Sequence, residues 1–347
     1  MRTALALTAA AAVAACASVP AIQPGTTAAV AAIVETAPVG TVNADAADDP
    51  AIWRNAANPS ASLIVATDKK AGLYVYGLDG RVRSFMPEGL LNNVDLIDLG
   101  QRGIIVAASD RNVVTAAKIR LYRLDPVTAR LTAIGVASGG AGEAYGICLA
   151  RAPRGAIDAF SVLKQGTIEQ VRLRIAGGAV TGTTVRRLSV PTQPEGCVVD
   201  ERTGQLFVGE ERAGIWRFDA RADAGLSGTI VAPVDGKQLV ADVEGLALAP
   251  VGRRGGYLVA SSQGDNAYAL YRLPDMQPAG RFRIVAGQLG STEETDGIAL
   301  ALGNFGPSFP RGLFVAQDGM NAPAAQNFKL VSWEDTLAAL SRPGRSR

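Results

Sequence analysis

The chain has 347 residues, with 34 basic and 32 acidic side chains, three cysteines and no histidine. The lack of histidine excludes Ser-His-Asp and Cys-His catalysis, phosphohistidine chemistry and every metal site that needs imidazole. Three cysteines are too few for a Cys-only zinc site, and a net charge of +2 argues against nucleic-acid binding. Carboxylates, Lys, Arg, Tyr and cations bound through oxygen remain for catalysis.

The amino terminus has the features of an export signal. Arg2 precedes an apolar run, Ala4 to Ala15, that is too short to cross a bilayer as a helix. The run ends in Val13-Ala14-Ala15-Cys16, which resembles the lipobox of bacterial lipoproteins. We expect residues 1–16 to be a lipoprotein-type signal peptide ending at a lipidated Cys16, with an ordinary Ala-x-Ala secretory signal as the alternative. Either predicts export, and the first predicts a periplasmic or cell-surface lipoprotein that contacts membrane only through its lipid anchor.

The signal is followed by three further segments. Residues 17–34 are rich in Ala and Thr and are expected to form a spacer. Residues 35–340 are expected to form one folded domain that closes with a short helix, Trp333 to Leu340, with Ser332 as its N-cap. A basic tail, residues 341–347, ends the chain.

A period of about fifty residues organises the domain. An acidic or polar turn followed by a short apolar strand occurs six times, and successive markers lie 47 to 52 residues apart; the markers are Asp48, Asp95, Tyr145, Glu195, Glu244 and Asp296. Two further alternating strands follow each marker, for example Leu206 to Gly209 and Ile215 to Phe218. Such a period is the length of one propeller blade. The sequence therefore predicts an all-β, six-bladed β-propeller with blades of four antiparallel strands.

The blade topology predicts where polar side chains gather. The first strand runs antiparallel to the second, so the start of one and the end of the other lie at the same end of the sheet. Acidic and basic groups occupy these positions in the six blades, and the expected mouth holds Asp49, Asp95, Glu195, Glu211, Glu244 and Asp296 beside Lys69, Lys70, Arg111 and Lys164.

Crowded carboxylates resist ionisation unless cations compensate them. Ca²⁺ accepts six to eight oxygen ligands in flexible geometry and needs no imidazole, while Mg²⁺ prefers a stricter octahedron. The interleaved Lys and Arg indicate that the ligand is itself anionic, and guanidinium and ammonium groups suit phosphate. These residues predict metal-dependent phosphate chemistry at one mouth of the propeller.

Several segments resemble the β-propeller (alkaline) phytases. They include Asp48-Asp49-Pro50-Ala51-Ile52-Trp53, Asp242-Val243-Glu244-Gly245-Leu246, Gly312-Leu313-Phe314-Val315-Ala316-Gln317-Asp318-Gly319 and Gln326-Asn327-Phe328-Lys329. The resemblance covers about Glu35 to Trp333 in order. It implies a Ca²⁺-dependent hydrolase that removes phosphate from inositol hexakisphosphate (phytate), taken as its calcium complex, by attack of a metal-activated water. We expect a monomer.

The resemblance also implies roles for individual residues. Active-site calcium is expected at Asp49, Glu195, Glu211, Glu244 and Asp296, and further metal contacts are expected at Asp48, Asp242, Gln263 and Asp318. Phosphate in the cleavage site is expected to meet Lys69, Arg111, Tyr145 and Lys164, with Lys70 and Asp95 nearby. Glu211 is the candidate that assists the attacking water.

Three features leave alternatives open. Where the family carries an acidic ligand for a structural calcium, Leu289-Gly290-Ser291 offers none, although Glu35, Asp318 and Asn321 could support other sites. Cys148 and Cys197 occupy matching strands of neighbouring blades and are expected to be buried thiols, although export permits a disulfide. A calcium-dependent propeller hydrolase of another class, such as a lactonase, and a non-catalytic lipoprotein scaffold are the alternative functions.

Overall fold

The computed structural model describes residues 27–341. The expected signal peptide with Cys16, most of the expected spacer and residues 342–347 of the tail lie outside the described residues. None of the described helices is long and apolar enough to cross a membrane.

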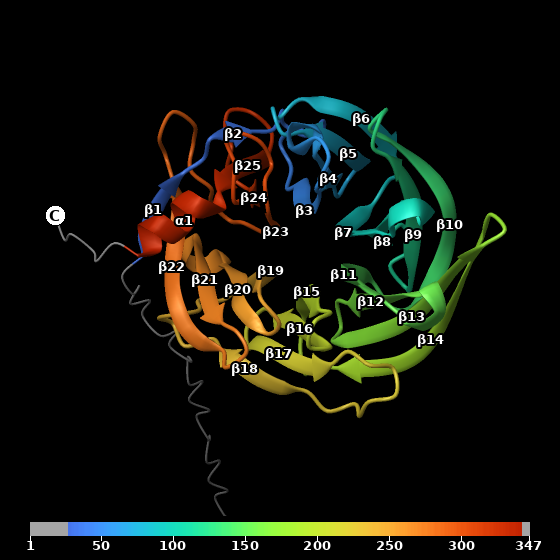
Figure 1. Ribbon diagram of the computed structural model, residues 1–347. Coiled ribbons are helices and arrows are strands. Elements are labelled where there is room, and N and C mark those ends of the chain that lie inside the picture. The colour runs from blue at the N-terminus through green and yellow to red at the C-terminus, as the bar shows by residue number, and fades with distance from the viewer. Residues whose placement is uncertain (1–26, 342–347) are drawn as a thin grey trace, which may run out of the picture.

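The described chain forms six β-sheets arranged in a ring around a central axis, which confirms the predicted six-bladed propeller (Figure 1). Each sheet has four antiparallel strands, and one sheet carries a fifth strand. Blade 1 contains β3 (Ala47–Trp53), β4 (Leu63–Asp68), β5 (Gly72–Gly77) and β6 (Val82–Pro87). Blade 2 contains β7 (Leu91–Asp98), β8 (Ile104–Asp110), β9 (Ala116–Asp125) and β10 (Arg130–Ala141). Blade 3 contains β11 (Ala144–Arg151), β12 (Ile157–Leu163), β13 (Thr167–Ala176) and β14 (Ala179–Ser189).

The other three blades follow the same pattern. Blade 4 contains β15 (Pro194–Asp200), β16 (Gln205–Glu210), β17 (Gly214–Asp219) and β18 (Thr229–Pro233). Blade 5 contains β19 (Val243–Val251), β20 (Gly255–Ser262), β21 (Ala267–Arg272), β22 (Gln277–Val285) and the added β1 (Ala28–Ala31). Blade 6 contains β23 (Ile298–Leu302), β24 (Gly312–Asp318), β25 (Asn327–Ser332) and β2 (Val34–Glu35). Short 3₁₀ turns lie at Pro59–Ala61, Gly100–Arg102, Pro153–Gly155 and Gln263–Asp265.

The ring closes through the amino-terminal strands. β2 pairs antiparallel with β25, so the start of the chain supplies the outer strand of the last blade. β1 pairs parallel with β22, with Ala28 opposite Phe282 and Ala31 opposite Val285. The expected spacer therefore ends before residue 28 and not at residue 34, because its last alanines and valines complete sheet edges.

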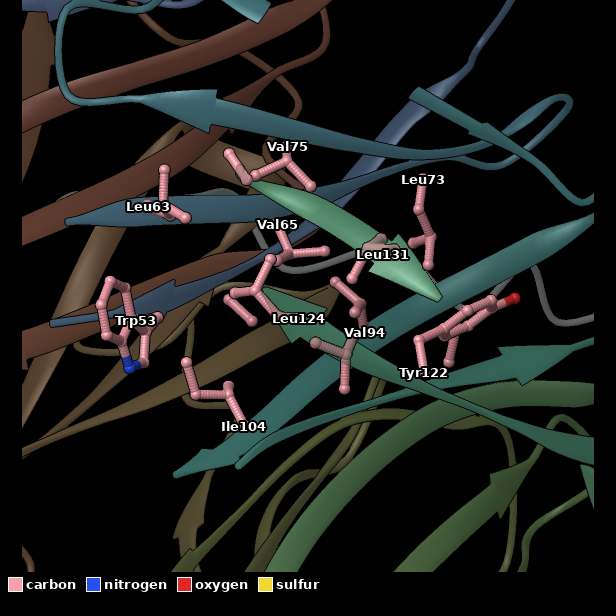
Figure 2. Close-up of a cluster of buried hydrophobic side chains, with 14 of the residues drawn as sticks. Trp53, Leu63, Val65, Leu73, Val75, Val94, Ile104, Tyr122, Leu124 and Leu131 are labelled. Carbon is pink, nitrogen blue, oxygen red and sulfur yellow. The ribbon is translucent and has the colours of Figure 1, made fainter. Parts of the chain in front are cut away.

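The core lies between neighbouring blades. Between blades 1 and 2, the inward residues Val65, Val75, Val94 and Tyr122 pack with Leu124 and are almost fully buried (Figure 2). Their alternation along each strand places every second side chain in the interface. After β25 the helix α1 (Trp333–Leu340) begins as predicted, with the Ser332 hydroxyl accepting from the backbone N–H of Asp335.

Cys148 and Cys197 form a disulfide, which corrects the expectation of free thiols. The two residues lie on β11 and β15, the innermost strands of blades 3 and 4, and their Cα atoms are 5.7 Å apart. Cα atoms at this separation are within the range that a disulfide spans. Equivalence along the repeat is what brings the two cysteines together across the blade boundary.

Candidate active site

A β-bulge at the start of the first strand of each of blades 1 to 5 positions the polar side chains of the mouth. In blades 1 to 5, the register between the first and second strands shifts immediately after the first pair, so two residues of the inner strand stand outside the regular ladder. Bulges of this kind redirect side chains at strand ends. The first bulged residue in successive blades is Asp48, Asn92, Tyr145, Glu195 and Glu244, and Asp296 takes the matching place before β23.

This register corrects the prediction for Asp95. Asn92 occupies the bulged position of blade 2, and Asp95 lies three residues farther along β7. The Asp95 carboxylate accepts from the backbone N–H groups of Leu96 and Leu149, and it lines a cavity of about 440 Å³ within the central channel. Burial raises the pKa of Asp95 to about 7. The structure does not place Asp95 beside the predicted phosphate-binding residues.

Glycine follows the bulged residue in four blades and permits close contact between them. A Cβ on Gly196 would lie 2.3 Å from the carbonyl oxygen of Glu244, and one on Gly297 would lie 2.5 Å from that of Asp48. The backbone N–H of Gly297 donates to the same Asp48 oxygen. These glycines therefore do more than form turns, because they hold the acidic residues of successive blades against one another.

Lys69 is the central cation of one side of the mouth. Its ammonium group lies 2.8 Å from Asp45, 2.9 Å from Asp48 and 2.9 Å from Asp296, and the side chain is almost fully buried. Burial opposes the charged form, but the carboxylates of Asp48, Asp296 and Asp45 outweigh it and raise the pKa of Lys69. Gln263 donates to the other oxygen of Asp296 at 2.7 Å. Lys69 is thus held as a cation, and its contact with phosphate stays a prediction.

Three buried glutamates form the other part of the mouth. Glu195, Glu211 and Glu244 each offer an oxygen within 4.8 Å of the others. Burial, and next the charge of Asp48, raise the pKa of Glu195 to about 7. Burial and then the charge of Glu195 raise the pKa of Glu244 well above its ordinary value. Burial likewise raises the pKa of Asp49 and of Asp296.

The glutamate cluster fits a divalent cation. Glu244 Oε2 is buried and has no hydrogen-bond partner among the described residues. Leaving such an oxygen unpaired is costly, and several carboxylates in one small volume repel one another. A hard cation would pair with the oxygen and offset the repulsion, since carboxylate oxygens are the ligands that Ca²⁺ and Mg²⁺ prefer. Residues Glu195, Glu211 and Glu244 would hold it.

Tyr145 joins the glutamates to the basic side of the site. Gln193 donates to the Tyr145 hydroxyl at 3.3 Å and also to Glu211. The Lys164 ammonium lies over the Tyr145 ring, 5.0 Å from its centre. Burial, followed by the charges of Glu195, Glu244 and Glu211, raises the pKa of Tyr145, so its hydroxyl keeps its proton.

Lys164 lines a hollow, and Arg111 lies near Glu143 of the same hollow. The Arg111 guanidinium is 3.6 Å from the carboxylate of Glu143, and the backbone N–H of Lys164 donates to the Glu143 carbonyl. Lys164 and Glu143 line a hollow of about 510 Å³. The mouth therefore brings together the predicted residues Lys69, Tyr145, Glu195, Glu211, Glu244 and Asp296. The side-chain amides of Gln193 and Gln263 hydrogen-bond to members of this group, and Lys164 and Arg111 lie at the edge of the mouth.

Other predicted residues have different surroundings. Asp318 is paired with the fully buried ammonium of Lys329, 3.2 Å away, and Lys329 also binds Glu35 and Asn321. A Cβ on Gly290 would lie 3.8 Å from that ammonium, so Lys329 supplies positive charge next to the segment that lacks the acidic ligand for a structural calcium. Asp318 is thus not part of the glutamate cluster. Burial is the larger cause that raises the pKa of Glu211, and the charge of Asp242, which precedes β19, raises it further. The Lys70 side chain is exposed.

Three contributing residues were not predicted. Asp45 pairs with Lys69, Asn92 donates to Asp48 at 3.2 Å and to Glu195 at 2.7 Å, and Gln193 links Tyr145 to Glu211. Asn92 belongs to a repeated turn and could have been found by its equivalence to Glu195. Asp45 and Gln193 precede the repeated turns and carry no comparable signal.

Comparisons with known proteins agree with this geometry. A family model described as phytase matches residues 1–343. The chain is 40% identical over 322 residues to a 3-phytase of Bacillus subtilis (strain 168), covering 88% of this chain and 84% of the relative. It also resembles a chain in a crystal structure of the mitotic checkpoint complex, with a TM-score of 0.51 and 14% identity, covering 96% of this chain and 86% of the other. At that identity the last likeness concerns the fold alone.

Proposed function

This chain belongs to the phytase family, and from that premise we propose that it removes phosphate from phytate with Ca²⁺ held by the glutamates of the propeller mouth. The supporting observation is the juxtaposition of an acidic cluster that fits a cation with a buried ammonium and a guanidinium at the same mouth. Carboxylates alone would suit a metal site without an anionic ligand. The added cations fit a substrate dense in phosphate.

Calcium is favoured over magnesium by the donor set. Glu195, Glu211 and Glu244 present three carboxylates in a small volume, and the charge of Glu195 also acts on Asp49 and Asp296. Ca²⁺ accepts oxygen-rich surroundings of flexible geometry, whereas Mg²⁺ keeps several waters in a strict octahedron. Phytate would enter as its calcium complex, so that substrate and site share the ions.

The chain's own residues orient the substrate. A bound divalent ion supplies charge neutralisation and lowers the pKa of a water molecule. Glu211, whose carboxylate accepts from the amide of Gln193, would accept a proton from an attacking water. Lys69 and Arg111 would stabilise the charge that develops on the phosphate oxygens. The protonated Tyr145 hydroxyl can donate to a phosphate oxygen, and Lys164 stands next to it.

The proposed function is tested by measuring inorganic phosphate released from phytate. We expect release with millimolar Ca²⁺, none with EDTA, and recovery when Ca²⁺ but not Mg²⁺ is restored in excess. Equal recovery with Mg²⁺ would overturn the choice of metal while leaving the enzyme class intact.

We also propose that the protein is an exported lipoprotein acting as a monomer. The export and the lipid anchor are supported by the short apolar segment and by the Val13-Ala14-Ala15-Cys16 motif. Growth with labelled palmitate is expected to label the wild-type chain and not Cys16→Ala. Labelling that persists in the variant, or its absence from both, would contradict the anchor.

A further inference from the structure

Arginines gather on the face opposite the mouth. The loops that connect the first and second strands all lie at that end, because Trp53 pairs with Leu63, Asp98 with Ile104 and Asp200 with Gln205 there. These six loops contain seven arginines and a single acidic residue, Glu201; the arginines are Arg54, Arg102, Arg154, Arg202, Arg253, Arg254 and Arg311. Every blade contributes at least one.

Loops of neighbouring blades contact one another around the far end of the channel. Arg102 of blade 2 donates to the Gly155 carbonyl of blade 3 at 2.6 Å, and Arg202 of blade 4 donates to the Gly252 carbonyl of blade 5 at 3.1 Å. Arg54 of blade 1 lies against Gly303 of blade 6. The first strands that carry these loops are the innermost strands of the ring (Figure 1). The arginines therefore share one surface.

Some of these arginines form ion pairs within the protein, whereas others are exposed and have no carboxylate partner among the described residues. Arg202 pairs with Asp200, and Arg311 pairs with Glu334. Within residues 27–341, no carboxylate pairs with Arg54, Arg154, Arg253 or Arg254, and all four are exposed. The turns between the third and fourth strands, at the same end, carry acidic and basic side chains that pair with each other, as in Asp79 with Arg81 and Arg272 with Asp275. These turns therefore do not neutralise the positive charge of the inner loops.

The first described strand, β1, points away from the arginine end. β22 starts at Gln277, opposite Arg272 at the far end, and runs toward the mouth. β1 is parallel to β22, so β1 also runs in the direction from the arginines toward the mouth. Cys16 is twelve residues before Ala28, a stretch that spans at most about 40 Å.

We propose that this arginine ring, defined as the seven arginines of the six loops, docks on an anionic phospholipid bilayer and turns the mouth away from it. Basic residues near a membrane surface gain about 1 kcal/mol each from anionic headgroups. A soluble polyanion such as phytate would then reach the acidic and basic groups of the mouth from the aqueous side. Docking does not require the proposed catalytic activity, so the two ideas can fail separately.

The test uses the full chain with Cys16→Ala, which cannot be acylated, and sedimentation with lipid vesicles. We expect binding to phosphatidylcholine vesicles containing about one third phosphatidylglycerol, and little binding to pure phosphatidylcholine. Raising the salt from about 0.1 M to 1 M shortens the Debye length from about 10 to 3 Å and should release the protein. No binding to the anionic vesicles, or equal binding to both, overturns the proposal.

Matched variants locate the surface. Arg54→Gln/Arg254→Gln should weaken vesicle binding by about 30-fold, since it removes two free charges. Lys118→Gln/Lys237→Gln removes two exposed charges from the mouth end and should change binding less than threefold. Both variants should release phosphate from phytate like the parent, which shows that they fold. Equal loss in both pairs, or tighter binding to duplex DNA than to the vesicles, overturns the proposal.

Discussion

The Lys69 ammonium lies 2.9 Å from a carboxylate oxygen of Asp296, although 227 positions separate the two residues in the chain. The contact joins the first blade to the last at the mouth of the propeller. It brings the predicted phosphate-binding lysine onto a predicted metal ligand, so substrate and cation must be arranged around one ion pair. Replacing either partner should therefore disturb both functions.

Substitution of this lysine should impair activity and stability together. Lys69→Met leaves Asp45, Asp48 and Asp296 without their shared cation, and breaking a buried ion pair costs about 3–5 kcal/mol. We expect phosphate release to fall at least 100-fold and the urea midpoint to drop. Lys118→Met, an exposed lysine without an ion pair among the described residues, is the control and should match wild type. A fully active Lys69→Met would contradict the role given to this ammonium.

Gln193 should act by positioning its neighbours. Gln193→Ala removes the donor shared by Tyr145 and Glu211, so we expect kcat to fall about tenfold to 100-fold with little change in the unfolding midpoint. Gln193→Asn keeps the amide but shortens its reach and should recover only part of the rate. If Gln193→Ala leaves kcat unchanged, the two hydrogen bonds have no catalytic role.

Metal-free protein should lose stability as the pH rises. The folded-state pKa of Glu195 is about 7, above its unfolded value, so its neutral form stabilises the fold at low pH. That contribution is lost between about pH 4.5 and 7, and amounts to roughly 3 kcal/mol. Urea titrations in EDTA should show this fall, and titrations with millimolar Ca²⁺ should not. The same decline with and without Ca²⁺ would show that the cluster does not bind the ion.

The disulfide should stabilise the ring measurably. It closes a loop with a sequence separation of 49, for which the chain-entropy model gives about 4 kcal/mol. Cys148→Ser/Cys197→Ser should lower the urea midpoint accordingly, and dithiothreitol should lower that of the wild type alone. An unchanged midpoint in the double variant would mean that the bridge does not form in solution.

The blade count and most of the residues that gather at the mouth could be predicted from sequence, because every blade repeats the same strand pattern and a similar polar turn. Asp95 was misplaced because a β-bulge shifts the register by local geometry that alternation does not record, and Asn92 takes its position. Contacts such as Gln193 with Tyr145 depend on how neighbouring blades meet, which a single-chain pattern does not contain. The disulfide follows from the same lateral packing. β1 was missed because an Ala-rich edge strand resembles a spacer.

The most direct test of the central claim is phosphate release from phytate by Glu211→Gln in millimolar Ca²⁺. Glu201→Gln, on the opposite face, is the matched control and should keep the wild-type rate within about twofold. We predict that Glu211→Gln reduces the rate at least 1000-fold while the protein stays folded, because it would remove a proposed ligand of the cation and the proposed acceptor for the water proton. A folded Glu211→Gln protein that releases phosphate at the wild-type rate would contradict the proposed active site.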